Sequence, residues 1–290
     1  MVAEDFIKDL QVREWLDGVE PAWTLLTFES LRALRQEPSA VQTAMRIAND
    51  LSADNIASAA VARNTLILLR QAIQRDGLPL TATGNLTRAT VAEMCKLFEW
   101  PDYDQADAFR FSKVINEPDF LPLHVVRKLA QAATLMRARR GKLVASPLGK
   151  SMLGDARRGS LPAILFHVAF WRMDLSYFGR GLLGSWPQAH AGVVLWSLSV
   201  CANDWQSVDK LTRLATIPEP SMLSSSWDRA PYAMEARILR PLLWFGLLEH
   251  RREQTPGSQF GEHHFYRKTQ LFDRLLGFDV QVELSQGARH

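Results

Sequence analysis

The sequence predicts a mainly α protein, organised as a helical bundle that carries short β-hairpins. Apolar residues recur at the 3.6-residue helical spacing along most of the chain, and short alternating segments flank tight turns. Of the 290 residues, 47% are hydrophobic, and a chain of this length buries roughly three-quarters of its unfolded surface, typically in two domains. With 22% charged residues and a net charge of +3, the composition excludes an intrinsically disordered chain.

The N-terminal region, residues 1–77, is expected to be helical. Its apolar residues follow the helical period in four segments. The predicted helices cover residues 5–16, 27–35, 38–47 and 54–75. The last helix is the longest, and Gly77 follows it in the position where a glycine commonly ends a helix.

Residues 78–160 are predicted to form helices followed by a hairpin. A short extended piece comes first, at residues 78–81. The expected helices cover residues 88–98, 109–116 and 121–134, and a further helix starts after Ser146. Thr87 is a good N-cap for the first of these helices, and Pro122 suits the first turn of the third. Strands at residues 135–137 and 143–145 flank a tight turn at Arg140-Gly141-Lys142.

The remaining sequence divides into two further regions. Residues 161–203 are rich in aromatic side chains and interrupted by Gly179 and Pro187, which predicts two or three buried helices in a central layer. Residues 204–290 repeat the pattern of residues 78–160. Helices are expected at residues 208–215 and 233–245, strands at 246–249 and 265–268, and a helical turn at 271–276.

Basic residues are concentrated in the middle of the chain. Residues 1–76 carry a net charge of −3, from 8 basic and 11 acidic residues, whereas residues 120–165 contain nine basic residues and one acid, Asp155. The nine are Arg127, Lys128, Arg137, Arg139, Arg140, Lys142, Lys150, Arg157 and Arg158. Such a patch attracts phosphate backbones or acidic proteins. The alternative is a solvated surface balanced by the acidic N-terminal region.

Helices followed by a hairpin with a basic tip are typical of a winged helix. The stretch from Leu123-His124-Val125-Val126-Arg127-Lys128-Leu129 to Leu148-Gly149-Lys150-Ser151-Met152-Leu153 resembles the third helix, wing and following helix of bacterial winged-helix proteins. Residues 78–153, which include Leu80-Thr81-Ala82-Thr83-Gly84-Asn85-Leu86, also resemble an uncharacterised bacterial segment. That segment accompanies the plasmid open-reading-frame family first named from a root-inducing plasmid, which has no agreed activity. The expected architecture therefore has two winged-helix-like units, residues 78–160 and 204–290.

The resemblance implies a regulatory protein that binds nucleic acid, in particular double-stranded DNA, without catalysis. In winged helices the third helix commonly lies in the major groove, and the wing tip contacts phosphate or the minor groove. The residues expected on or near the outer face of this helix are His124, Arg127, Lys128 and Gln131. The wing would add Arg137, Arg139, Arg140 and Lys142. The open alternative is a protein-interaction or dimerisation module, because many winged helices dock proteins instead.

The sequence contains no catalytic motif, so an enzyme is not expected. Gly-rich phosphate loops, the nucleophile elbow and the His-Glu-x-x-His helix are all absent. His263 and His264, with Glu262 and His250, suggest a metal, but adjacent histidines on a strand point to opposite faces. We therefore expect neither a metal nor a cofactor.

The expected location is the cytoplasm, with no membrane partner. Only two cysteines occur, which suits a reducing compartment. No apolar run reaches the roughly 18 residues of a membrane span, and the first residues lack the apolar core of a signal peptide.

Overall fold

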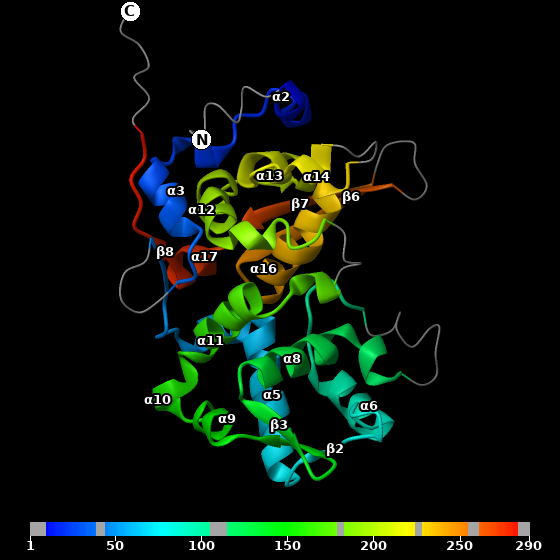
Figure 1. Cartoon of the computed structure of the whole chain (residues 1–290). Helices are drawn as coiled ribbons and strands as arrows, with labels where there is room; N and C mark the ends of the chain where they lie inside the picture. The colour runs from blue at the N-terminus through cyan, green and yellow to red at the C-terminus, as the bar shows by residue number, and fades with distance from the viewer. Residues whose placement is uncertain are drawn as a thin grey trace, which may run out of the picture. The chain divides into compact units, whose positions relative to one another are not determined.

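The computed structural model describes residues 10–38, 44–104, 115–178, 183–223, 228–254 and 261–283, which form two compact units. Unit 2 comprises residues 48–173, and unit 1 combines the chain up to Ile47 with the chain from Asp174 onward. Helices predominate and the sheets are small and antiparallel, which confirms the mainly α fold class (Figure 1). The boundaries predicted after residues 77, 160 and 203 fall inside these units rather than at their limits. In the described ranges, no helix has both the length and the apolar character needed to cross a bilayer.

Unit 2 is organised around helix α5 (Ala60–Gln74), which packs against α8 (Leu121–Ala132), α11 (Leu161–His167) and strand β4 (Lys142–Ala145). Its other helical elements are α4 (Ala53–Ser58), α6 (Arg88–Leu97), η2 (Glu117–Asp119), α9 (Pro147–Ser151), α10 (Asp155–Arg158) and the π-helical turn η3 (Val168–Arg172). The single helix predicted over residues 54–75 is two helices, because Ala59 adopts an extended conformation between α4 and α5. The helix predicted over residues 109–116 falls mostly outside the described residues.

The sheet of unit 2 contains the predicted hairpin. Its strand order is β2 (Leu78–Pro79), β4, β3 (Met136–Arg139), all antiparallel. Arg139 lies opposite Lys142, so the connecting turn is only two residues long. Arg140 and Gly141 both have positive φ, at 50° and 71°, which is typical of the turn that best matches strand twist.

Unit 1 is built from both ends of the chain. The N-terminal elements are α2 (Leu10–Leu16), η1 (Ala22–Leu25), α3 (Phe28–Leu34) and β1 (Met45–Ile47). Strand β1 pairs with β8 (Leu276–Phe278), and Leu26 forms a bridge with Val282. The prediction of a helix up to residue 47 is wrong at Met45–Ile47, which is a strand, and residues 39–43 lie outside the described part.

Helix α12 (Ala191–Cys201) forms the centre of unit 1. It packs against η1, α3 and α13 (Val208–Ala215), and apolar residues on all its sides are buried, as expected for a helix without a polar face. Gly192 permits the close approach to α3, because a Cβ at this position would lie 2.1 Å from the Leu34 carbonyl oxygen. The other elements are η4 (Leu175–Phe178), η5 (Gln188–His190), β5 (Gln206–Ser207), α14 (Pro220–Leu223), α15 (Ala230–Met234), the π-helical turn η6 (Glu235–Leu239), α16 (Arg240–Trp244), β6 (Leu248–Gln254), β7 (Glu262–Lys268) and α17 (Gln270–Leu275).

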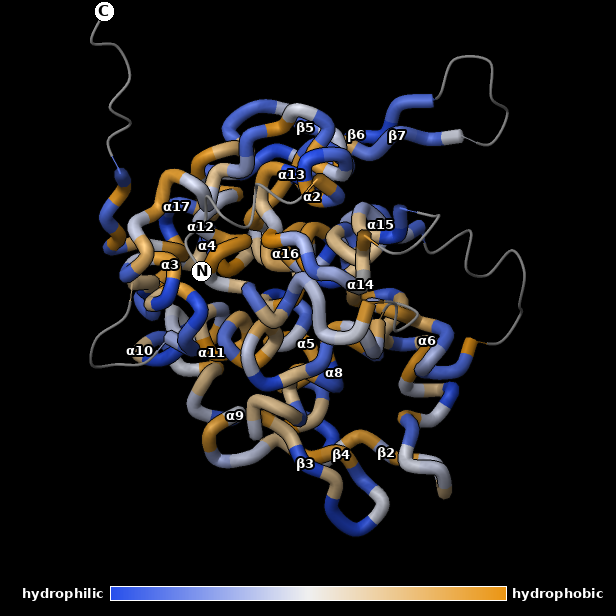
Figure 2. The backbone as a smooth tube through the Cα atoms, turned by 45° about the horizontal axis from the view of Figure 1, so that its top comes forward, coloured by the Kyte–Doolittle hydropathy of each residue, from blue (hydrophilic) through white to orange (hydrophobic). Residues whose placement is uncertain are grey.

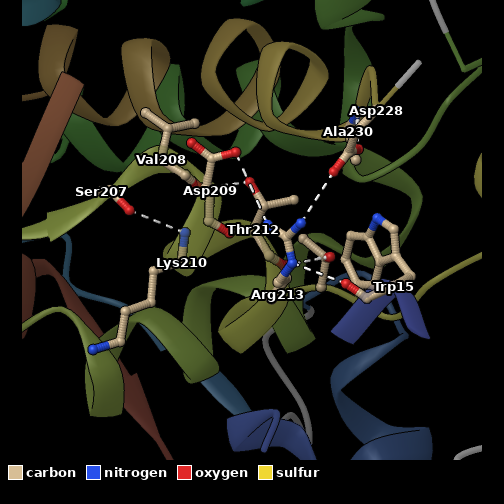
Figure 3. Close-up of polar contacts among 10 residues, drawn as sticks. Trp15, Ser207, Val208, Asp209, Lys210, Thr212, Arg213, Asp228 and Ala230 are labelled. Carbon is tan, nitrogen blue, oxygen red and sulfur yellow. Dashed lines mark hydrogen bonds and ion pairs between the residues drawn. The ribbon is translucent and has the colours of Figure 1, made fainter. Parts of the chain in front are cut away.

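Arg213 on α13 connects several of these elements (Figure 3). Its Nε donates to the Trp15 carbonyl oxygen at 2.9 Å, and its guanidinium lies 5.4 Å from the centre of the Trp15 ring. A second nitrogen contacts the Asp228 carboxylate at 3.3 Å. One side chain thereby joins α2, α13 and the segment that leads into α15.

The two units contain the same order of elements. In unit 2, α5, β2, α6 and α8 precede the β3–β4 hairpin, and in unit 1, α12, β5, α13 and the helix α15–η6–α16 precede the β6–β7 hairpin. In both sheets the short first strand pairs with the second strand of the hairpin, in the orders β2–β4–β3 and β5–β7–β6.

Most aromatic side chains of residues 161–203, including Phe166, Phe170 and Trp186, are buried.

Candidate nucleic-acid interface

The β3–β4 hairpin presents three exposed arginines, Arg137, Arg139 and Arg140, which together with Lys142 we call the cationic hairpin. Figure 2 shows its turn as a hydrophilic loop that extends beyond the helices of unit 2. Arg137 and Arg139 share one face of β3, because alternate residues of a strand point the same way. Among the described residues, no acidic side chain pairs with any of the three arginines.

Lys142 lies directly opposite Arg139, a placement of like charges that destabilises a sheet. The Lys142 ammonium group donates to the Asp76 carbonyl oxygen at 3.0 Å and lies 3.4 Å from the Asp76 carboxylate. Lys142 is therefore held by a neighbour, whereas the three arginines face solvent.

The structure corrects the expected positions of His124 and Arg127. Both were predicted on or near the outer face of the third helix, but their side chains are buried, with residue exposures of 8% and 6%. Arg127 donates to the Glu117 carboxylate and, at 2.6 Å, to the Gly84 carbonyl oxygen. His124 Nδ1 lies 3.4 Å from the same carboxylate. In this structure neither side chain is available to a base edge.

Glu117 forms the centre of this buried polar network. Glu117 is fully buried, and one of its carboxylate oxygens accepts a hydrogen bond of 2.6 Å from the Leu86 backbone N–H. Burial by itself would raise the pKa of Glu117, but the hydrogen bonds from His124 and Leu86 and the charge of Arg127 lower it below its ordinary value. The ionised carboxylate therefore joins η2 and α8 to the loop at residues 84–86. Glu117 was not among the residues predicted from the sequence, although its position ahead of the basic residues of α8 could have indicated a buried partner for them.

The rest of α8 offers little exposed surface. Lys128 and Gln131 are half-buried, and the helix contacts α5, α6, η2, β3 and η3. Near η2, an open depression of about 720 Å³ is lined mainly by polar residues. Its walls include Thr81, Asn85, Arg88, Asn116 and Asp119. The predicted site residues therefore separate into two groups, with Arg137, Arg139, Arg140 and Lys142 on the hairpin and the remaining four on a largely covered helix.

Comparison with known proteins places the similarity in unit 2. Residues 57–159 match the family described as the Y4jL N-terminal domain, a range that contains the predicted residues 78–153 and confirms that resemblance. An uncharacterised protein, y4jL, from Sinorhizobium fredii (strain NBRC 101917 / NGR234) is 34% identical over 91 residues. The alignment covers 31% of this chain and 41% of that relative, so the match spans less than half of either protein. No solved structure matches the chain.

Proposed function

We propose that the chain is a non-catalytic, regulatory nucleic-acid-binding protein with two winged-helix-like units, and that the cationic hairpin of unit 2 contacts the phosphate backbone of double-stranded DNA. The observation that carries the proposal is the set of exposed arginines without an acidic partner among the described residues. Guanidinium groups bind phosphate oxygens well, and backbone contacts position a protein on DNA. The shared order of helices and hairpin in the two units supports the winged-helix assignment.

The contacts should be mainly electrostatic. His124 and Arg127 are engaged inside unit 2, and α8 is covered by its neighbours. Base reading by this helix therefore contributes little, and the arginines of the hairpin act on the backbone or in the minor groove. Such binding depends strongly on salt and weakly on sequence.

The test is a salt titration of binding to random duplex DNA. Replacement of Arg137, Arg139 and Arg140 by Ala should reduce the slope of log K against log salt by roughly two to three, because each phosphate contact contributes about 0.9. The control variant carries Arg32→Ala, Arg46→Ala and Arg229→Ala, three exposed arginines of unit 1 with the same change of net charge. An equal decrease of the slope in both variants would show a general effect of net charge and would contradict a DNA contact at the hairpin.

A protein-interaction or dimerisation module is the second candidate, and the burial of α8 favours it. A winged helix whose third helix is covered has lost the element that usually enters the major groove. Light scattering after size exclusion, run on the samples used for the DNA titration, separates the two functions. A stable oligomer that does not retain DNA at low salt supports the second function and contradicts the first.

A further inference from the structure

Three potential metal ligands of unit 1 converge beside the β6–β7 hairpin. His250 comes from β6, His264 from β7, and Glu235 is the first residue of η6. One ligand atom from each lies within 4.8 Å of the others, and all three residues are half-buried. We propose that this His–Glu cluster, defined as Glu235, His250 and His264, binds a divalent transition-metal ion, with Zn²⁺ as the best fit.

The strand register explains why the two histidines meet. His250 lies opposite Tyr266, and His264 lies opposite Arg252. Residues two apart on a strand share a face, so the two histidines are diagonal neighbours on one side of the sheet, with ring centroids 5.0 Å apart. The adjacent His263 points to the other face and takes no part.

Glu235 completes a ligand set suited to zinc. One of its carboxylate oxygens lies 2.6 Å from His264 Nδ1. Two imidazoles and one carboxylate are ligands of known zinc sites, with metal–ligand bonds of about 2.0–2.2 Å. Tetrahedral ligands at that distance lie roughly 3.4 Å apart, so small side-chain rotations bring the cluster to the required spacing. Imidazole ligands disfavour Ca²⁺ and Mg²⁺, which prefer oxygen.

The surroundings orient the ligands as outer partners do in metal sites. The Tyr266 hydroxyl donates to the Glu235 carboxylate at 2.9 Å, and the Tyr266 ring stacks on His250 with a centroid distance of 4.6 Å. The Glu262 carboxylate lies 3.8 Å from His264 Nε2, on the side of the ring away from Glu235. This distance is within the range of an ion pair but beyond that of a hydrogen bond, so the Tyr266 hydroxyl is the outer partner that orients the cluster. Glu235 also begins a π-helical turn, a feature frequent at functional sites.

The experiment measures metal binding by the full chain without an affinity tag, after chelation and dialysis. Calorimetric titration with Zn²⁺ should show one saturable site per chain, and Co²⁺ should give visible absorption typical of nitrogen and oxygen ligands. Mg²⁺ and Ca²⁺ should not compete. Absence of saturable Zn²⁺ binding overturns the proposal.

Variants on the two faces of the hairpin locate the site. His250→Ala and His264→Ala should each weaken Zn²⁺ binding by more than the roughly 10- to 100-fold loss expected for the outer partner variant Tyr266→Phe. The matched control, His263→Ala, removes an exposed histidine from the opposite face of the same strand and should retain wild-type affinity. An equal loss in the control overturns the proposal. Circular dichroism of the metal-free variants shows whether each one folds. If His264→Ala does not fold, the Zn²⁺ affinity of His250→Ala is compared with that of the control instead.

Discussion

Replacement of Arg127 by Met tests whether this residue stabilises unit 2 from inside. The substitution keeps an unbranched side chain of similar length and removes the charge that pairs with Glu117. The Glu117 carboxylate would remain fully buried, with only the Leu86 N–H and His124 as partners, and the Gly84 carbonyl would lose its donor. Removal of one member of a buried ion pair typically costs about 3–5 kcal/mol. At ~4 °C per kcal/mol for a unit of this size, the melting temperature should fall by roughly 12–20 °C.

The assay is thermal and urea unfolding followed by circular dichroism. Arg139→Met is the matched control, because it makes the same substitution at an exposed arginine of the same unit and should change stability by less than about 0.5 kcal/mol. The double variant Glu117→Leu with Arg127→Met removes both charges and should recover much of the loss, since a buried pair can be replaced by apolar residues at little cost. A melting temperature of Arg127→Met equal to that of the wild type would refute the structural role of this pair.

Three further outcomes follow from the packing and from the pKa shifts. Gly192→Ala should destabilise unit 1 by about 1–3 kcal/mol in a urea titration, because its Cβ would lie 2.1 Å from the Leu34 carbonyl oxygen. The control Gly154→Ala, whose nearest contact would be at 3.5 Å, should be nearly neutral in the same titration. Burial and the charge of Arg35 lower the pKa of His190 from 6.5 to about 4, so the folded state should lose up to about 3 kcal/mol as pH falls through this interval, and His190→Gln should flatten that dependence. The Glu219 carboxylate, 3.6 Å from His190 Nε2, is too distant to offset the burial. Burial raises the pKa of the Cys201 thiol to about 12 and also raises the pKa of the Cys95 thiol. Iodoacetamide at pH 8 should therefore modify both cysteines far more slowly in folded than in urea-unfolded protein, and equal rates would contradict the burial of these thiols.

Elements determined by local sequence were predicted well. Pro122 stands in the first turn of α8, and Ser146 caps α9 by accepting the Gly149 N–H. The sequence Arg140-Gly141-Lys142 predicted the β3–β4 hairpin because Gly141 easily adopts the positive φ that a two-residue turn requires. Helical spacing alone, however, could not show that the backbone is extended at Ala59.

Long-range pairing explains what the sequence did not predict. Strands β1 and β8 are three residues each and lie more than two hundred residues apart, so neither forms a recognisable pattern. Arg127 lies off the apolar stripe of α8, yet η2 and the loop at residues 84–86 cover that side. The histidine cluster depends on strand register, which the sequence does not specify. His263 and His264 do lie on opposite faces, but His250 reaches His264 from the neighbouring strand.

The discontinuity of unit 1 has a consequence for biosynthesis. Trp23 and Leu34 precede unit 2 in the sequence and are translated before it, and both are buried in the finished protein. The strand that pairs with β1 is synthesised only after the whole of unit 2, which at 5–20 residues per second means a delay of roughly 10–50 s. Unit 2 can therefore fold while the early segment still exposes its hydrophobic side chains near the ribosome. Chaperones that recognise such segments should bind the nascent chain until its C-terminal part emerges.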